Sequence, residues 1–134
     1  MVDVELPALH PEPVQIVRLW QVYLDNVNPL LKVTHTPSLQ GRLIEAASDV
    51  TTIAPTLEAL MFGIYCMSIL SLNEDTCQAM FNSSKQNLMA RYQVGCQHAL
   101  WNCKFLRSNE RECLVAFYFY LVCRAICYCY LLVS

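Results

Sequence analysis

The chain has 134 residues, of which 55% are hydrophobic and only 15% are charged, whereas ordinary globular chains contain about 25% charged residues. This balance excludes intrinsic disorder, which requires few apolar residues and much charge. Nine Lys and Arg residues against eleven Asp and Glu residues give a formal net charge of −2. A protein that binds nucleic acid on its own normally carries a basic excess on one face, so we expect no direct nucleic-acid contact from this chain.

The length allows one domain, but the apolar content exceeds what such a domain can cover. A domain of this size buries only about two-thirds of the surface that its unfolded chain exposes. Apolar residues run in long blocks and there are only three glycines. The composition therefore indicates part of something larger.

The first helix is expected directly after an irregular lead-in over residues 1–12, which has no sustained apolar period. Pro13 suits the first turn of a helix, where its missing N–H costs nothing. Apolar residues then recur at alternating steps of three and four, which is typical of an amphipathic helix. These are Val17, Trp20, Leu24, Val27 and Leu31. Pro29 lies inside this pattern and predicts an end or a kink near Asn28.

The second and third helices both begin at a proline. Thr36 is predicted to cap a short helix that has Pro37 at its first position and that stops near Asp49. Pro55 then opens a helix that extends to about Leu72. Because this third helix is apolar nearly all round, we expect it to be central and buried.

Two polar capping residues divide the middle of the chain. Asn73 is followed by two carboxylates at the positive end of the helix dipole, which predicts a short helix through Phe81. Ser84 restarts the chain and opens a long helix with Gly95 in its middle. Glycine costs a helix about 1 kcal/mol relative to alanine, so we expect another helix to approach closely at this point.

A connector over residues 105–107 leads to Ser108, a further predicted cap, and to a last helix from about Asn109. No segment has the alternating pattern of a half-buried strand. The sequence therefore predicts an all-α fold, a bundle-like array of about six helices.

Three basic residues, Lys104, Arg107 and Arg111, are spaced three and four apart near this connector. Residues at that spacing lie on one face of a helix. We interpret them as a solvated surface stripe.

The eight cysteines raise the question of zinc. They are Cys66, Cys77, Cys96, Cys103, Cys113, Cys123, Cys127 and Cys129. No C-x-x-C pair occurs, and the three histidines lie far apart in the sequence, so the close ligand pairs of structural zinc sites are missing. We expect free thiols that pack as small hydrophobes. The acidic N-terminus is unlike a secretory signal, so we expect a reducing compartment.

No catalytic or cofactor-binding residue is predicted, because the chain has no H-E-x-x-H, no glycine-rich phosphate loop and no G-x-S-x-G. His98 lies in a predicted helix beside Cys96, and we interpret it as a surface residue. Glu110 and Glu112 are two apart and therefore point to different sides of a helix.

Several short segments have a familiar order and spacing. They are His10-Pro11, Gln15-Ile16, Arg18–Gln21, Tyr23–Leu30, His35, Pro37–Leu39, Leu57–Phe62, Ile64-Tyr65, Leu88, Arg91-Tyr92, Ala99-Leu100 and Phe105–Ser108. Together they resemble the fungal-specific transcription factor domain, the middle homology region of zinc binuclear-cluster regulators.

The resemblance implies transcription regulation in a fungal nucleus by a helical domain without catalytic residues. Its partners would be proteins, either full-length regulators of the family or the transcription machinery. Zinc in that family belongs to a separate six-cysteine cluster that reads DNA, and no part of this chain matches such a cluster.

The resemblance also suggests how the chain is divided. Residues 13–121 resemble the N-terminal part of the family's domain, which is about twice as long as this chain, and residues 122–134 form a divergent apolar tail. We expect a truncated gene product or a misread exon boundary to explain this tail.

The apolar run over residues 114–133 leaves two other functions open. It is long enough to span a bilayer, although Arg124 near its middle would cost about 2.5–3.5 kcal/mol there, so a small tail-anchored membrane protein is one alternative. As a helix of the domain, it would instead pack Phe117, Leu121 and Ile126 against its neighbours. A non-enzymatic interaction module is the other alternative, because Leu114–Leu121 would expose apolar surface of the kind that binds partners.

Overall fold

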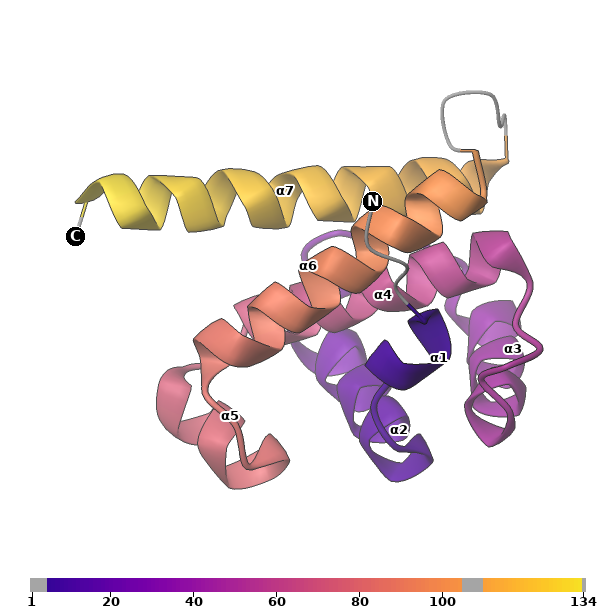
Figure 1. Cartoon of the computed structure of the whole chain (residues 1–134), viewed down its shortest axis with the longest axis horizontal. Helices are drawn as coiled ribbons and strands as arrows, with labels where there is room; N and C mark the ends of the chain where they lie inside the picture. Colours follow the sequence, from indigo (N-terminus) through magenta and orange to yellow (C-terminus); the bar gives the residue numbers. More distant parts are fainter. Residues whose placement is uncertain (1–4, 105–109, 134) are drawn as a thin grey trace.

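The computed structural model describes residues 5–104 and 110–133 (Figure 1). Every regular element in these ranges is helical, which confirms the all-α prediction. The elements are α1 (Leu6–Leu9), α2 (Pro13–Val22), the π-helical turn η1 (Tyr23–Val27), α3 (Thr36–Ser48), α4 (Pro55–Leu70), α5 (Glu74–Phe81), α6 (Lys85–Asn102) and α7 (Arg111–Val133). The described residues thus form seven α-helices where about six were expected, and the additional one is α1.

Helix α1 lies inside the lead-in that was expected to be irregular. The Ala8 N–H donates to the Glu5 carbonyl over 3.0 Å, and Pro7 occupies the first turn, where no N–H is needed. Leu6 is buried in the core. A single turn is too short to show an apolar period, so the sequence pattern did not reveal it.

Helix α2 begins at Pro13 as predicted and ends through η1, where the Asn28 N–H donates to the Tyr23 carbonyl over 2.9 Å. The expected end near Asn28 is therefore confirmed. The buried residues of this segment are Ile16, Leu19, Trp20, Val22, Tyr23 and Val27. The predicted stripe was wrong at Val17, which is exposed, and Leu24 is only partly buried. The predicted residues, such as Val17 and Leu24, and the buried ones, such as Ile16, are all apolar. Their spacing alone therefore does not show which of them face the core.

Helix α3 begins one residue earlier than predicted. Thr36 is its first helical residue, and His35 stands at the cap position without a side-chain bond to the helix backbone. The side chain of His35 instead lies 2.9 Å from the Ser38 hydroxyl.

Helix α4 is the centre of the fold, as its apolar sequence predicted. Its residues 59–69 are all buried, and it contacts α2, η1, α6 and α7. Figure 1 shows α6 and α7 crossing it, with α2 on its other side.

Both polar caps predicted in the middle of the chain are present. The Asn73 side chain accepts from the Thr76 N–H at the start of α5, and the Ser84 hydroxyl accepts from the Asn87 N–H at the start of α6. The close approach expected at Gly95 is also confirmed, because the ring of Phe62 on α4 fills the space in which a Cβ would lie.

The connector and the cap predicted at residues 105–108 lie outside the described residues. Helix α7 begins at Arg111 and continues to Val133, so it passes through the start of the predicted tail without a break. Lys104 and Arg111 are exposed, as expected for solvated basic residues. They do not share one helical face, because Lys104 follows the end of α6 with a φ of 53°, while Arg111 opens α7 and donates to the Val33 carbonyl. Arg107 lies outside the described residues.

The cysteines behave as small hydrophobes, as expected. Five are buried, Cys103 and Cys127 are half-buried, Cys129 is exposed, and all eight are free thiols. Among the described residues, no group of three or more His, Cys, Asp or Glu side chains is arranged to hold a metal ion.

Candidate functional site

A buried histidine fastens the N-terminal segment to the central helix. His10 follows α1 and inserts between two residues of α4, with its Nδ1 atom 2.9 Å from the Tyr65 hydroxyl and its Nε2 atom 3.0 Å from the Glu58 carboxylate. Its ring centroid lies 4.4 Å from that of Phe62. We call Glu58, His10 and Tyr65 the His10 lock.

The hydrogens of the lock follow from the donor inventory. An ionised carboxylate only accepts hydrogen bonds, so the His10 tautomer that satisfies the contact with such a carboxylate at Glu58 carries its hydrogen on Nε2. In a neutral imidazole, Nδ1 then accepts from the Tyr65 hydroxyl. Burial raises the pKa of Tyr65 well above its ordinary value, and nearby Tyr92 and Glu58 raise it further. The phenol therefore stays protonated, and in this tautomer it has a hydrogen to donate to Nδ1.

Arg91 on α6 supports the lock from the other side. Its guanidinium donates to the carbonyls of Leu9 over 3.0 Å, of Ala8 over 2.9 Å and of His10 over 3.3 Å. The last carbonyls of a helix have no partners within it, and here a cation satisfies them. Residues 8–10 are thus held between α4 and α6 by polar groups.

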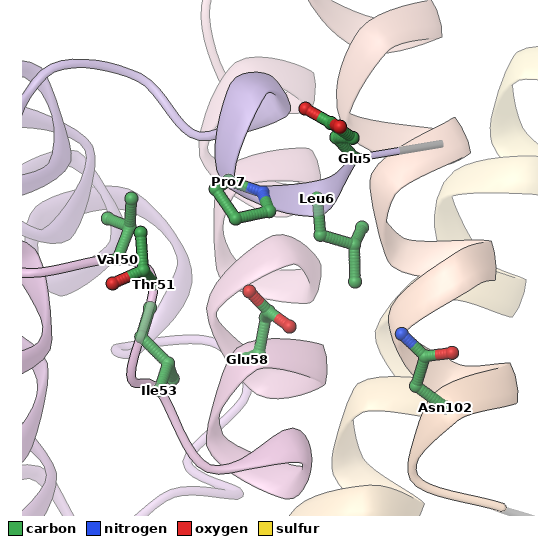
Figure 2. Close-up of a pocket in the computed structure, with 8 residues that line it drawn as sticks. All are labelled: Glu5, Leu6, Pro7, Val50, Thr51, Ile53, Glu58 and Asn102. Carbon is green, nitrogen blue, oxygen red and sulfur yellow. The ribbon is translucent and has the colours of Figure 1, made fainter. Parts of the chain in front are cut away.

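A pocket of about 380 Å³ lies beside the lock. Figure 2 shows Glu58 between the loop residues Val50, Thr51 and Ile53 on one side and Asn102 of α6 on the other, with α1 above it. The remaining lining residues are Glu5, Leu6 and Pro7. Two carboxylates and apolar groups share this surface, and the carboxylate of Glu58 already accepts from His10.

The outer face of α7 is the other candidate site. Its exposed residues include Leu114, Tyr118, Leu121, Ala125 and Tyr128, which recur at steps of four, three, four and three. We call these five residues the α7 stripe. That spacing is the heptad pattern with which helices pair, and an exposed apolar patch of this kind marks an interaction surface.

The stripe corrects one expectation and meets another. Leu121 and Ile126 were expected to pack against neighbouring helices, but both are exposed. Phe117 is half-buried and packs against the core, as expected. Over residues 111–129 of α7, whose burial is described, the buried residues are instead Cys113, Ala116, Phe119 and Cys123. Because this helix is apolar on every side, its sequence could not indicate which side faces the core. The expectation that Leu114–Leu121 exposes apolar surface is confirmed at Leu114, Tyr118 and Leu121.

The segment Arg111–Cys129 is long and apolar enough to cross a membrane. In the fold its inner side packs on α4, where Phe119 lies 3.3 Å from the position of a Cβ at Gly63. A helix that spans a membrane alone would expose this inner side, including Phe119, to lipid. Packing on α4 and spanning the bilayer alone are therefore alternatives for the same residues.

No site residue was predicted from the sequence, so His10, Glu58 and Arg91 were missed. Glu58 lies 48 residues after His10, and Arg91 lies 81 residues after it. No local sequence pattern links residues so far apart. The other noted residues have structural positions: Glu112 forms an ion pair with Arg42 of α3 at 2.9 Å, and His98 is half-buried on α6.

The curated proteins that this chain is similar to include fungal transcription regulators. It is 64% identical over 119 residues to the transcriptional regulator AacuB of Aspergillus aculeatus, covering 89% of this chain and 16% of the relative. It is 53% identical over 120 residues to the transcriptional regulator nsrM of Aspergillus novofumigatus, covering 90% and 17%. The C6 finger domain transcription factor adaR of Aspergillus niger is 32% identical over 121 residues, covering 89% and 15%.

No family model matches the chain, and no solved structure matches it significantly. The chain spans about one sixth of the length of the relatives it matches. Over almost nine tenths of its own length, this chain is a homologue of a segment of the fungal C6 zinc-cluster transcription regulators.

Proposed function

We propose that this chain regulates transcription in a fungal nucleus as a helical regulatory segment that does not itself contact DNA. The observation that carries the proposal is its identity to named transcriptional regulators over almost its whole length. Its net charge of −2 favours protein contacts over DNA contacts. The zinc of the family would belong to a separate DNA-binding cluster, and no cofactor is assigned to this chain.

The proposed mode of action is binding to proteins, either full-length family regulators or the transcription machinery. The exposed α7 stripe supports this, because it combines large apolar side chains with a regular helical spacing. The His10 lock has a different role, because it fixes the N-terminal segment on α4.

A tethered reporter tests the proposal. The chain is fused to an unrelated DNA-binding domain and expressed in a fungal host that carries a reporter gene under the matching sites. We expect reporter transcription to differ from that given by the DNA-binding domain alone, in a direction that identifies activation or inhibition. Phe62→Ala, which removes a fully buried ring from the core, should abolish the difference. An unchanged reporter with equal amounts of nuclear fusion protein would contradict the proposal.

A tail-anchored membrane protein is the second candidate, and the length and apolar character of α7 favour it. Carbonate extraction of membranes from cells that express a tagged chain separates the two functions. The regulatory proposal predicts release of the chain into the supernatant. A chain that stays in the membrane pellet would favour the anchor.

A further inference from the structure

We propose that residues 5–11 form a strap that opens as a unit while helices α2–α7 stay folded. The strap comprises α1 and His10, and its closed form is the one that the His10 lock holds. This inference goes beyond the proposed function, because it concerns a conformational switch inside the fold. Its test uses the purified chain alone, so its outcome does not depend on the reporter.

The strap is held mainly by polar contacts. Leu6 is buried and Leu9 is half-buried, whereas the other residues of the strap, except His10 and the half-buried Pro11, are exposed. The remaining contacts come from the imidazole of His10 and from the three backbone carbonyls that accept from Arg91. Opening of the strap therefore brings little apolar surface into water.

The strap cannot keep its helical turn once it leaves the core. Helix α1 has only four residues, and the Ala8 N–H donates to the Glu5 carbonyl over 3.0 Å. A single turn fixes several backbone dihedrals for one hydrogen bond, so an isolated turn is unstable in water. Opening therefore frees the Ala8 amide to exchange its hydrogen with solvent.

Two prolines separate the strap from α2. Pro11 and Pro13 have no N–H to donate, and the residues before them, His10 and Glu12, are extended, with ψ of 142° and 154°. Helix α2 takes its first hydrogen bond from Glu12, whose carbonyl accepts from the Ile16 N–H over 2.9 Å. The strap can therefore move without breaking a hydrogen bond of α2.

The centre of the fold does not depend on the strap. Helix α4 packs against α2, η1, α6 and α7, and none of these contacts involves residues 5–11. Opening also lets water reach the carboxylate of Glu58, the hydroxyl of Tyr65 and the guanidinium of Arg91, so no polar group of the lock is left buried without a partner. Opening of the strap therefore requires less free energy than unfolding of the whole chain.

The strap also completes the pocket beside Glu58. Glu5, Leu6 and Pro7 form one wall of this pocket, and Figure 2 shows them on α1 above Glu58. An open strap removes that wall. A small molecule that contacts the wall binds only the closed state and stabilises it, so the strap couples this pocket to the position of the segment before α2.

Native-state hydrogen exchange of the full chain at low urea concentrations tests the proposal. We expect the Ala8 amide to exchange faster than the Ile64 amide on α4, at a rate that does not depend on urea, because a local opening exposes little surface. The Ile64 amide should exchange only through global unfolding, and its rate should rise steeply with urea.

Three substitutions separate the opening of the strap from global unfolding. Arg91→Lys replaces the guanidinium that holds three carbonyls and should accelerate exchange at Ala8 about tenfold. Arg42→Lys is the matched control, because Arg42 pairs with Glu112 instead, and it should leave the Ala8 rate unchanged. Phe119→Leu weakens the core on α7, so it should accelerate exchange at Ile64 about tenfold and leave the Ala8 rate unchanged.

Three results would overturn the proposal. An Ala8 amide that exchanges with the rate and urea dependence of Ile64, or that Phe119→Leu accelerates equally, would show that the strap unfolds with the core. An Ala8 amide that exchanges as fast as in an unfolded peptide would show that the strap is not closed. Equal Ala8 rates in Arg91→Lys and Arg42→Lys would show that Arg91 does not hold it.

Discussion

A Cβ atom at Gly95 would lie 2.6 Å from Cδ1 and 2.9 Å from Cζ of Phe62. Real Cβ atoms do not approach other atoms this closely, so α6 crosses α4 at a distance that only glycine allows. The ring has no room to move away, because Phe62 is fully buried and also packs on His10 and Tyr65. The crossing of the two long helices therefore depends on this pair.

Gly95→Ala should destabilise the fold even though alanine is the better helix former. Overpacking of a core typically costs 1–3 kcal/mol, which exceeds the helix-propensity gain of about 1 kcal/mol. Gly41→Ala on α3 is the matched control, because no atom lies within 4 Å of its Cβ position, and it should stabilise the fold by up to about 1 kcal/mol. Urea unfolding measures both changes. Equal effects of the two substitutions would contradict the described crossing.

The structural reason for Gly95 could be predicted, but the identity of Phe62 could not. A glycine inside a helix lowers the stability of that helix, which indicates that another element needs the space. The caps at Asn73 and Ser84 are also local, because each accepts from an N–H three residues further along the chain. The partner of a close approach is set by tertiary packing, which sequence spacing does not contain. Local rules therefore predicted helix starts better than contacts.

His10→Ala should destabilise the chain by about 1–3 kcal/mol, because it leaves the buried Tyr65 hydroxyl without the imidazole. The same substitution at His98, which is half-buried on α6, should change the free energy of unfolding by less than about 0.5 kcal/mol. Limited proteolysis provides a second measurement, since residues 5–12 should be cleaved faster once the lock is removed. Equal unfolding energies for the two variants would show that the lock does not stabilise the fold.

The contacts of the His10 lock could not be predicted from the sequence. Residues 1–12 have no apolar period, and only Leu6 and His10 of the described lead-in are buried. The segment is held by a histidine and by an arginine 81 residues away, and single polar contacts over such separations leave no pattern in the sequence. The face of α7 was misassigned for the opposite reason, because every side of that helix is apolar.

Stability should decrease at alkaline pH because of the buried tyrosines. Burial raises the pKa of Tyr92 to about 12 against the opposing effect of Arg91. Because the pKa in the folded state is raised, the contribution of Tyr92 is fully present below its ordinary pKa of 10.0 and is lost as the pH rises toward 12. Urea unfolding at a series of alkaline pH values measures this decline, which Tyr92→Phe should make shallower. Constant stability through that range would contradict the burial of Tyr92.

The thiols should differ in reactivity according to their burial. Cys129 is exposed, whereas Cys66 is buried, and burial raises the pKa of Cys66 well above its ordinary value and that of Cys103 to about 12. The thiolate is the reactive form, so a disulfide reagent near neutral pH should modify Cys129 first. Cys129→Ser should remove the fastest phase, and urea should make all remaining thiols reactive. Modification of Cys66 as fast as Cys129 in the folded chain would show that the core is open.

The most direct test of the account is to replace a segment of a relative. In AacuB, the 119 residues that match this chain are deleted, or are exchanged for the corresponding residues of this chain, and the transcript of an AacuB-dependent gene is measured in the fungus. We expect the deletion to alter the transcript level and the exchange to restore it, while the exchange that also carries Phe62→Ala should behave like the deletion. An exchanged regulator that is present in the nucleus at the normal level but leaves transcription as in the deletion would contradict a regulatory role for this chain.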